Sequence, residues 1–258
     1  MSNNMIYLVG EAHPETLLFS SLSYASHHLP TEEWIDFIKS YSILVNPKNS
    51  KKYSREHSNS KRNLTFYFRT INKYFSEVRA KDGHYYRLDE QEFSRRDENQ
   101  FWKEMEVAMN RIKNILPQGN SACNLISRSR KVLNRKRQLI RTHKPEVIYH
   151  EGSKKELDSM GLHILFKRVA EEIGSEIVYL DHGFGPYRKG LEKSEVQRGR
   201  EEYWIKRILS RQSSGTAMAF VGSLHIKGEK NQESEWGRFP RLLEEAGLEH
   251  RVLEVMRP

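Results

Sequence analysis

Short apolar runs that alternate with amphipathic stretches constrain the fold of this chain most strongly. Runs with the length and the Val, Ile, Leu and Tyr content of buried strands lie at residues 5–9, 146–149, 176–180, 217–221 and 251–255. Amphipathic stretches with helical spacing separate the last four, at residues 158–173, 195–210 and 238–245. Strands that alternate with helices favour parallel pairing with right-handed crossovers. The sequence therefore predicts an α/β fold with a mostly parallel sheet flanked by helices.

The long segment between the first and second apolar runs does not follow this alternation. We expect it to form a large, mostly helical insertion or cap after the first strand, covering residues 20–144. The α/β core that carries the functional site would then consist of residues 1–19 and 145–258. A chain of 258 residues is long enough for one large domain with such an insertion.

Within the expected insertion, the local pattern changes several times. Residues 31–45 begin with TEEW, which resembles a capping box, and residues 97–116 and 121–143 carry helical apolar stripes. Residues 47–62 are almost entirely polar, which predicts a mobile loop. The aromatic-rich residues 63–78 fit either a helix or a strand.

Polar signatures follow four of the five expected strands. They are Gly10-Glu11-Ala12-His13, His150-Glu151-Gly152, Asp181-His182-Gly183 and Gly222-Ser223-Leu224-His225. Parallel strands end at one edge of a sheet, which is where α/β proteins place their ligands. We therefore expect these side chains to share one site, with His13 and His225 on neighbouring strands and facing each other across a polar cleft.

Imidazole and carboxylate groups serve both as general acids and bases and as metal ligands. In a hydrolase, His13 or Glu11 would act as general base on a water molecule, which Glu151 and His225 would orient. Alternatively, Glu11, His13, Glu151 and His225 would hold a divalent metal such as Mn, Co, Zn or Fe. Arg200, in the segment QRGREEYW, would neutralise negative charge on a small-molecule or peptide substrate, an anionic one included.

These residues, in this order, resemble the superfamily that groups Tiki, TraB and GumN proteins with ChaN haem-binding lipoproteins and erythromycin esterases. The resemblance rests on the two G-x-x-H segments, the strand ending in Glu151, the helix led by Arg200, and a Leu-Leu-x-x-x-Gly segment at residues 242–247. It covers the first fifteen residues and roughly residues 145 to 255, but not the insertion.

The resemblance implies an α/β core with a variable helical part over the site. It also implies either metal-dependent, protease-like hydrolysis or esterase-like hydrolysis without a firmly bound metal. A third branch implies haem binding, for which the additional histidines His150 and His182 would be suited. The absence of an N-terminal signal sequence argues against the ChaN branch.

Composition leaves one further class of partner open. The formal net charge is +9, and residues 127–141 read SRSRKVLNRKRQLIR. With the basic residues of 51–62, this segment could bind the phosphate backbone of nucleic acid, although a solvated helix face is the simpler interpretation. No apolar run is long enough to span a bilayer, and Cys123 stands alone, so we expect a cytoplasmic protein without membrane contact.

Overall fold

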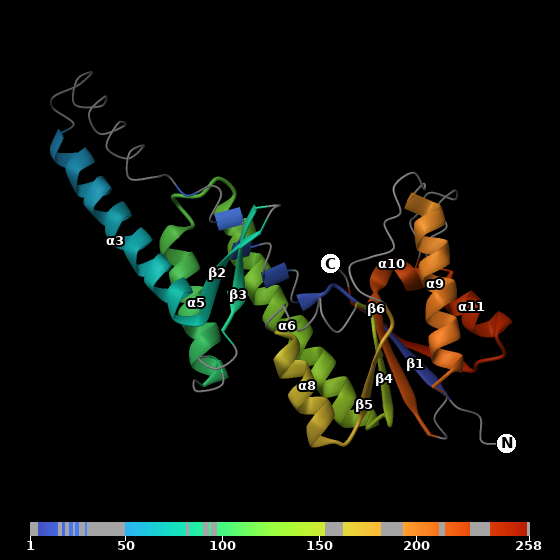
Figure 1. Ribbon diagram of the computed structural model, residues 1–258. Helices are drawn as coiled ribbons and strands as arrows, with labels where there is room; N and C mark the ends of the chain where they lie inside the picture. Colours follow the sequence, from blue (N-terminus) through green and yellow to red (C-terminus); the bar gives the residue numbers. More distant parts are fainter. Residues whose placement is uncertain are drawn as a thin grey trace. The chain divides into compact units, whose positions relative to one another are not determined.

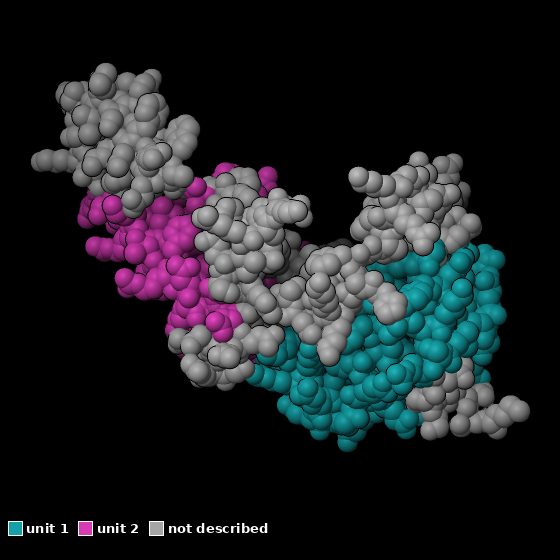
Figure 2. All heavy atoms as spheres, viewed as in Figure 1, with its two compact units in different colours: residues 1–15, 131–258 teal, residues 16–130 magenta. Residues whose placement is uncertain are grey.

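The computed structural model shows two compact units (Figure 1). It describes residues 5–14, 17–18, 21–22, 24–25, 29, 50–80, 83–89, 93, 97–152, 162–181, 193–211, 215–227 and 238–256. Unit 1 comprises residues 1–15 and 131–258, and unit 2 comprises residues 16–130 (Figure 2). The second boundary falls inside a long helix, earlier than the expected residue 145, because the C-terminal part of that helix packs on the sheet of unit 1.

Unit 1 is built on a five-stranded, all-parallel sheet in the order β5-β4-β6-β1-β7. The strands are β1 (Ile6–Glu11), β4 (Val147–His150), β5 (Glu176–Tyr179), β6 (Ala217–Gly222) and β7 (His250–Val255). The predicted α/β class is confirmed. Since β1 pairs with β6 from Ile6↔Ala217 to Glu11↔Gly222, the two G-x-x-H segments leave neighbouring strands at the same edge.

Helices cover both faces of this sheet (Figure 1). On one face lie α9 (Lys193–Leu209) and α11 (Phe239–Glu245), and on the other lie α6 (Gly119–His143) and α8 (His163–Glu172). Successive strand residues point to opposite faces, so Tyr149 packs with Trp204 whereas Ile148 packs with Phe166. Burial on both faces explains why the strands are almost continuously apolar.

In unit 2, α3 (Ser50–Tyr74) packs on α5 (Glu98–Ile112), and a hairpin of β2 (Phe75–Ala80) and β3 (Gly83–Leu88) follows α3. The prediction of a mobile loop at residues 47–62 was wrong for residues 50–62, which form the first half of α3, and residues 47–49 lie outside those described. Residues 63–78 contain both alternatives, the end of a helix and then a strand. Leu64, Tyr67, Ile71 and Tyr74 form a buried stripe along α3. This packing stabilises a helix that its polar N-terminal half would not form alone.

Some expectations concern residues outside those that the structure describes. They are the helix at residues 31–45, the second half of the Asp181-His182-Gly183 signature, and the first part of the amphipathic stretch at residues 158–173. Among the described residues, no helix has the length and apolar content required to cross a membrane.

Candidate active site

The ends of four strands in unit 1 bring acidic and basic side chains to one edge of the sheet. Glu11 is the last residue of β1, Glu151 comes directly after β4, and Asp181 lies two residues after the end of β5. His225 lies in the short helix α10 (Ser223–Lys227), which begins where β6 ends. The backbone holds this edge together, since the Glu151 amide donates to the Phe220 carbonyl at 2.9 Å.

His13 lies between two carboxylates. Its Nδ1 is 3.2 Å from Glu11 Oε1, and its Nε2 is 3.5 Å from Glu151 Oε2. The His13 side chain is 34% exposed, whereas the side chains of Glu11 and Glu151 are 0% and 9% exposed. His13 is therefore the member of this trio that solvent or a substrate can reach.

Glu151 contacts four groups around it. His225 Nε2 lies 3.4 Å from its Oε1, and Arg200 Nη2 lies 2.9 Å from the same oxygen. Its Oε2 accepts a hydrogen bond from the backbone N–H of Gly222 and faces His13. A Cβ at position 222 would lie 3.1 Å from His13 Nε2 and 3.2 Å from Glu151 Oε2, so an alanine there would displace these side chains by a few tenths of an ångström.

Two further carboxylates hold the cations that contact Glu151. Glu201, on α9, accepts from His225 Nδ1 at 2.6 Å. Asp181 accepts two hydrogen bonds from the Arg200 guanidinium and one from Trp204 Nε1 at 2.7 Å. Arg200 thus binds two carboxylates of the protein itself, those of Asp181 and Glu151.

On the other side of the site, Lys136 of α6 is fully buried. Its Nζ lies 2.7 Å from Glu11 Oε2 and 2.7 Å from His150 Nε2. His150 Nδ1 in turn donates to the Glu151 carbonyl at 2.6 Å. Lysine has only donors, so His150 must accept through Nε2 and is the neutral tautomer. With both ring nitrogens engaged, the structure does not present His150 as an additional haem ligand.

The pKa shifts follow from these contacts. Burial would raise the pKa of Glu151, but His13 and His225 outweigh burial and hold it well below its usual range. Burial would likewise raise the pKa of Glu11, which Lys136 and His13 instead lower.

The histidines of the site divide into two kinds. Burial opposes the charged form of His13, yet Glu151 and Glu11 raise the pKa of His13 well above its ordinary value. The pKa of His225 is raised in the same way by Glu151 and Glu201. For His150, burial and the adjacent Lys136 lower the pKa to about 3. The neighbouring carboxylates thus favour the protonated form of His13 and His225, whereas His150 is neutral.

Two residues of the site, Lys136 and Glu201, were not predicted from the sequence, although the sequence pattern around each could have indicated it. Lys136 falls on the apolar stripe of α6, between Leu133 and Ile140, and it is 0% exposed. Glu201 falls in the same way on the buried face of α9, which continues with Trp204 and Ile208. A charged residue on the apolar face of an amphipathic helix must find a partner in the interior, and that pattern could have indicated both.

Comparison of the chain with protein-family models, with curated proteins and with solved structures finds no match. Membership of the Tiki superfamily therefore stays a prediction from the motifs. The site itself contains all five residues expected to be catalytic, Glu11, His13, Glu151, Arg200 and His225, within one connected set of contacts.

The expected metal ligands are placed differently from the ligands of a metal centre. Among the described residues, no group of three or more His, Cys, Asp or Glu side chains is arranged to hold a metal ion. Lys136 and Arg200 contact the carboxylates of Glu11 and Glu151 directly, so each carboxylate already has a cationic partner.

Proposed function

We propose that unit 1 is a hydrolase in which His13 transfers protons between water, substrate and leaving group. The proposal rests on one observation: a partly exposed imidazole is held between the buried carboxylates of Glu11 and Glu151. Such a pair of carboxylates orients the ring and stabilises the imidazolium that forms when His13 accepts a proton.

The energetic cost of the surrounding network supports a functional role. Glu11, Lys136, Glu201 and His225 are each no more than 2% exposed. Burying charged groups is expensive, and apolar residues of similar volume are often as stable or more so. A cluster of buried charges with shifted pKa values at the ligand-binding edge of a parallel sheet is therefore typical of an active site.

The reaction that fits these groups is hydrolysis of an ester or amide bond. Neutral His13 would take a proton from a water molecule as the water oxygen bonds to the acyl carbon. The resulting imidazolium would then give that proton to the departing alkoxide or amine, while the acid product keeps the water oxygen. Glu151, held by Arg200 and His225, would orient His13 during both steps.

The test is a screen of the purified protein against chromogenic esters and amides, with wild type compared to His13→Gln. We expect kcat/KM to fall by about 10²- to 10⁴-fold, which is the range for loss of a general acid–base group. His250→Gln is the matched control. His250 pairs with the start of β1, at the opposite end of the sheet, so this variant should keep wild-type activity.

Metal and haem content, measured on the same samples, separates the alternatives. Activity that survives a chelator and depends on His13 supports the proposal. Stoichiometric metal that is lost with activity in His13→Ala/His225→Ala would replace it with the metal-dependent reaction, and a Soret band would indicate haem binding. Equal activity in His13→Gln and His250→Gln would refute a catalytic role for His13.

A further inference from the structure

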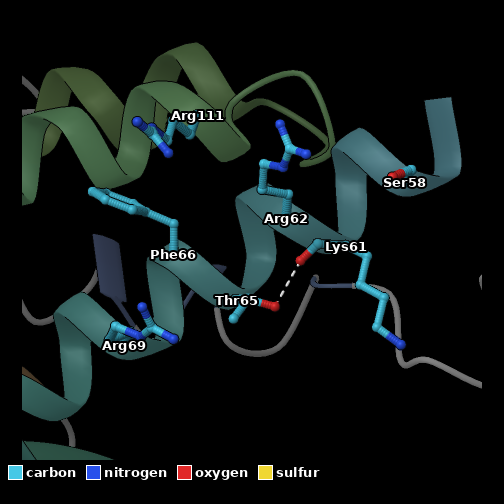
Figure 3. Close-up of a pocket in the computed structure, with 7 residues that line it drawn as sticks. All are labelled: Ser58, Lys61, Arg62, Thr65, Phe66, Arg69 and Arg111. Carbon is cyan, nitrogen blue, oxygen red and sulfur yellow. Dashed lines mark hydrogen bonds between the residues drawn. The ribbon is translucent and has the colours of Figure 1, made fainter. Parts of the chain in front are cut away.

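Unit 2 contains a basic pocket that the proposed hydrolase does not use. The pocket has a volume of about 420 Å³ and lies between α3 and α5 (Figure 3). It is lined by Ser58, Lys61, Arg62, Thr65, Phe66, Arg69 and Arg111. Four of these seven side chains are cationic, and no acidic residue is among them.

Six of the seven residues that line the pocket share one face of α3. Positions 58, 61, 62, 65, 66 and 69 follow the spacing of a single helical stripe, opposite the buried stripe that contains Tyr67 and Ile71. Over its whole length α3 carries seven Lys or Arg residues against a single Glu. The pocket is thus formed largely by the exposed, charged face of α3, and α5 contributes Arg111 to it.

The cations of this pocket differ from those of α6, where the sequence suggested a basic binding surface. On α6, Arg130, Arg135 and Arg141 each pair with a Glu, and Lys136 is buried against Glu11. In the part of the chain that the structure describes, by contrast, no carboxylate forms an ion pair with Arg62, Arg69 or Arg111. Among the described residues, the guanidinium groups of the pocket thus have no carboxylate partner, whereas three of the arginines of α6 do.

One of these groups is also held in place. The Arg111 guanidinium lies over the Phe66 ring, with its Cζ 3.9 Å from the ring centroid. Figure 3 shows Arg111 coming from α5 while the other basic side chains come from α3. Stacking on an aromatic ring orders a guanidinium without neutralising its charge, so less freedom is lost when it binds an anion.

We propose that this pocket binds phosphate groups. Arginine matches the geometry of a phosphate through two parallel hydrogen bonds, and three arginines line the pocket. The stripe from Lys61 to Arg69 extends for roughly 12 Å along the helix at 1.5 Å per residue. This length suits an anion with several phosphates, either the backbone of a single-stranded nucleic acid or a free polyphosphate.

The experiment measures binding of a fluorescently labelled single-stranded oligonucleotide to the full chain by anisotropy, with inorganic tripolyphosphate as competitor. Arg62→Gln/Arg69→Gln should weaken binding by about tenfold or more, since this variant lacks two of the charged hydrogen-bond donors. The salt dependence should also decrease, with the slope of log K against log salt falling by about 0.7 for each phosphate that the variant no longer neutralises.

The matched control is Arg55→Gln/Lys103→Gln, which removes the same charge from exposed positions of α3 and α5 outside the pocket. It should weaken binding by less than threefold or so, because only the long-range field changes. Circular dichroism of both variants verifies that the helices are intact.

Each outcome is decisive for the proposal. Weaker binding by the pocket variant alone, with competition by tripolyphosphate, supports a phosphate site on a nucleic-acid strand. Binding of tripolyphosphate alone, measured by calorimetry and abolished in the pocket variant, assigns the pocket to a free polyphosphate. Equal weakening in both variants, or binding of neither probe, would overturn the proposal. None of these results depends on the hydrolase activity of unit 1.

Discussion

Gly222 lies beside both His13 and Glu151, and its lack of a side chain allows these two residues to lie close together. Its N–H donates to Glu151 Oε2, and a Cβ would lie 3.1 Å from His13 Nε2. We expect Gly222→Ala to push the imidazole and the carboxylate apart by a few tenths of an ångström. The change should lower kcat/KM by about tenfold, which is less than the roughly 10²-fold that a misplacement of about 1 Å causes. Steady-state kinetics with the active ester or amide measures this.

Gly199→Ala is the control for that substitution. Gly199 lies in α9, with no atom near its missing Cβ. The change should leave activity unaltered and stabilise the protein by up to about 1 kcal/mol, because alanine is the better helix former. A Gly222→Ala protein with full activity would mean that the spacing of His13 and Glu151 does not control the reaction.

Lys136 neutralises Glu11 in the interior, so its removal leaves an unpaired buried carboxylate. We expect Lys136→Met to lower the free energy of unfolding by about 3 kcal/mol or more. In the double variant Lys136→Met/Glu11→Gln, the second substitution removes the unpaired negative charge of Glu11 and should recover part of this stability. Urea unfolding at neutral pH measures both, and additive effects of the two changes would show that the residues do not interact.

At the scale of elements, the five strands were predictable because parallel strands buried on both faces are short, continuous apolar runs. The helix α3 was not predictable, because its N-terminal half is polar and its stability comes from Tyr67, Ile71 and Tyr74 packing on α5.

For the site, the ends of the predicted strands indicated Glu11, His13 and Glu151. Lys136 and Glu201 come from helices, whose register against the sheet a sequence pattern does not specify.

Glu104 is the residue of α5 that connects this helix to the end of α3. Its carboxylate accepts from Lys73 Nζ at 2.6 Å and from the Tyr74 hydroxyl at 2.8 Å. Partial burial raises the pKa of Glu104, but these partners outweigh burial and lower it. We expect Glu104→Gln to destabilise the protein by about 1 kcal/mol near pH 7.

The sign of the pH dependence follows from the lowered pKa. A carboxylate with a depressed folded-state pKa contributes stability that is complete above its ordinary pKa of 4.5 and is lost as the pH falls through the folded-state value. The difference in unfolding free energy between wild type and Glu104→Gln should therefore shrink on acidification. Glu106→Gln is the control, since its partner Arg130 is 3.6 Å away and partly exposed, and it should change stability by less than about 0.5 kcal/mol.

At the scale of the molecule, the site joins elements that are far apart in the sequence. Contacts connect Glu201 to His225, His225 to Glu151, Glu151 to His13, and His13 to Glu11. Lys136 continues the series from Glu11 to His150. Acidic and basic groups alternate from Glu201 to Lys136, so the protonation of each depends on its neighbours. His13 is the partly exposed member of the series and contacts solvent.

This coupling predicts the pH profile of the proposed hydrolase. The reactive form of His13 is the neutral imidazole, and Glu151 with Glu11 raises the pKa of His13 well above the ordinary 6.5. In wild type, kcat/KM should therefore increase with pH, with its midpoint above the ordinary histidine value. Glu151→Gln removes the first of the two charges that raise this pKa, so the midpoint should move to lower pH by about one unit or more.

The shift distinguishes a general base from a merely structural histidine. Glu151→Gln should also lower the maximal rate, because the amide stabilises the imidazolium less than the carboxylate does and a weaker base accepts the proton less readily. Glu176→Gln, on the exposed side of β5, should leave the profile unchanged. A midpoint that stays in place in Glu151→Gln would mean that the ascending limb belongs to another group.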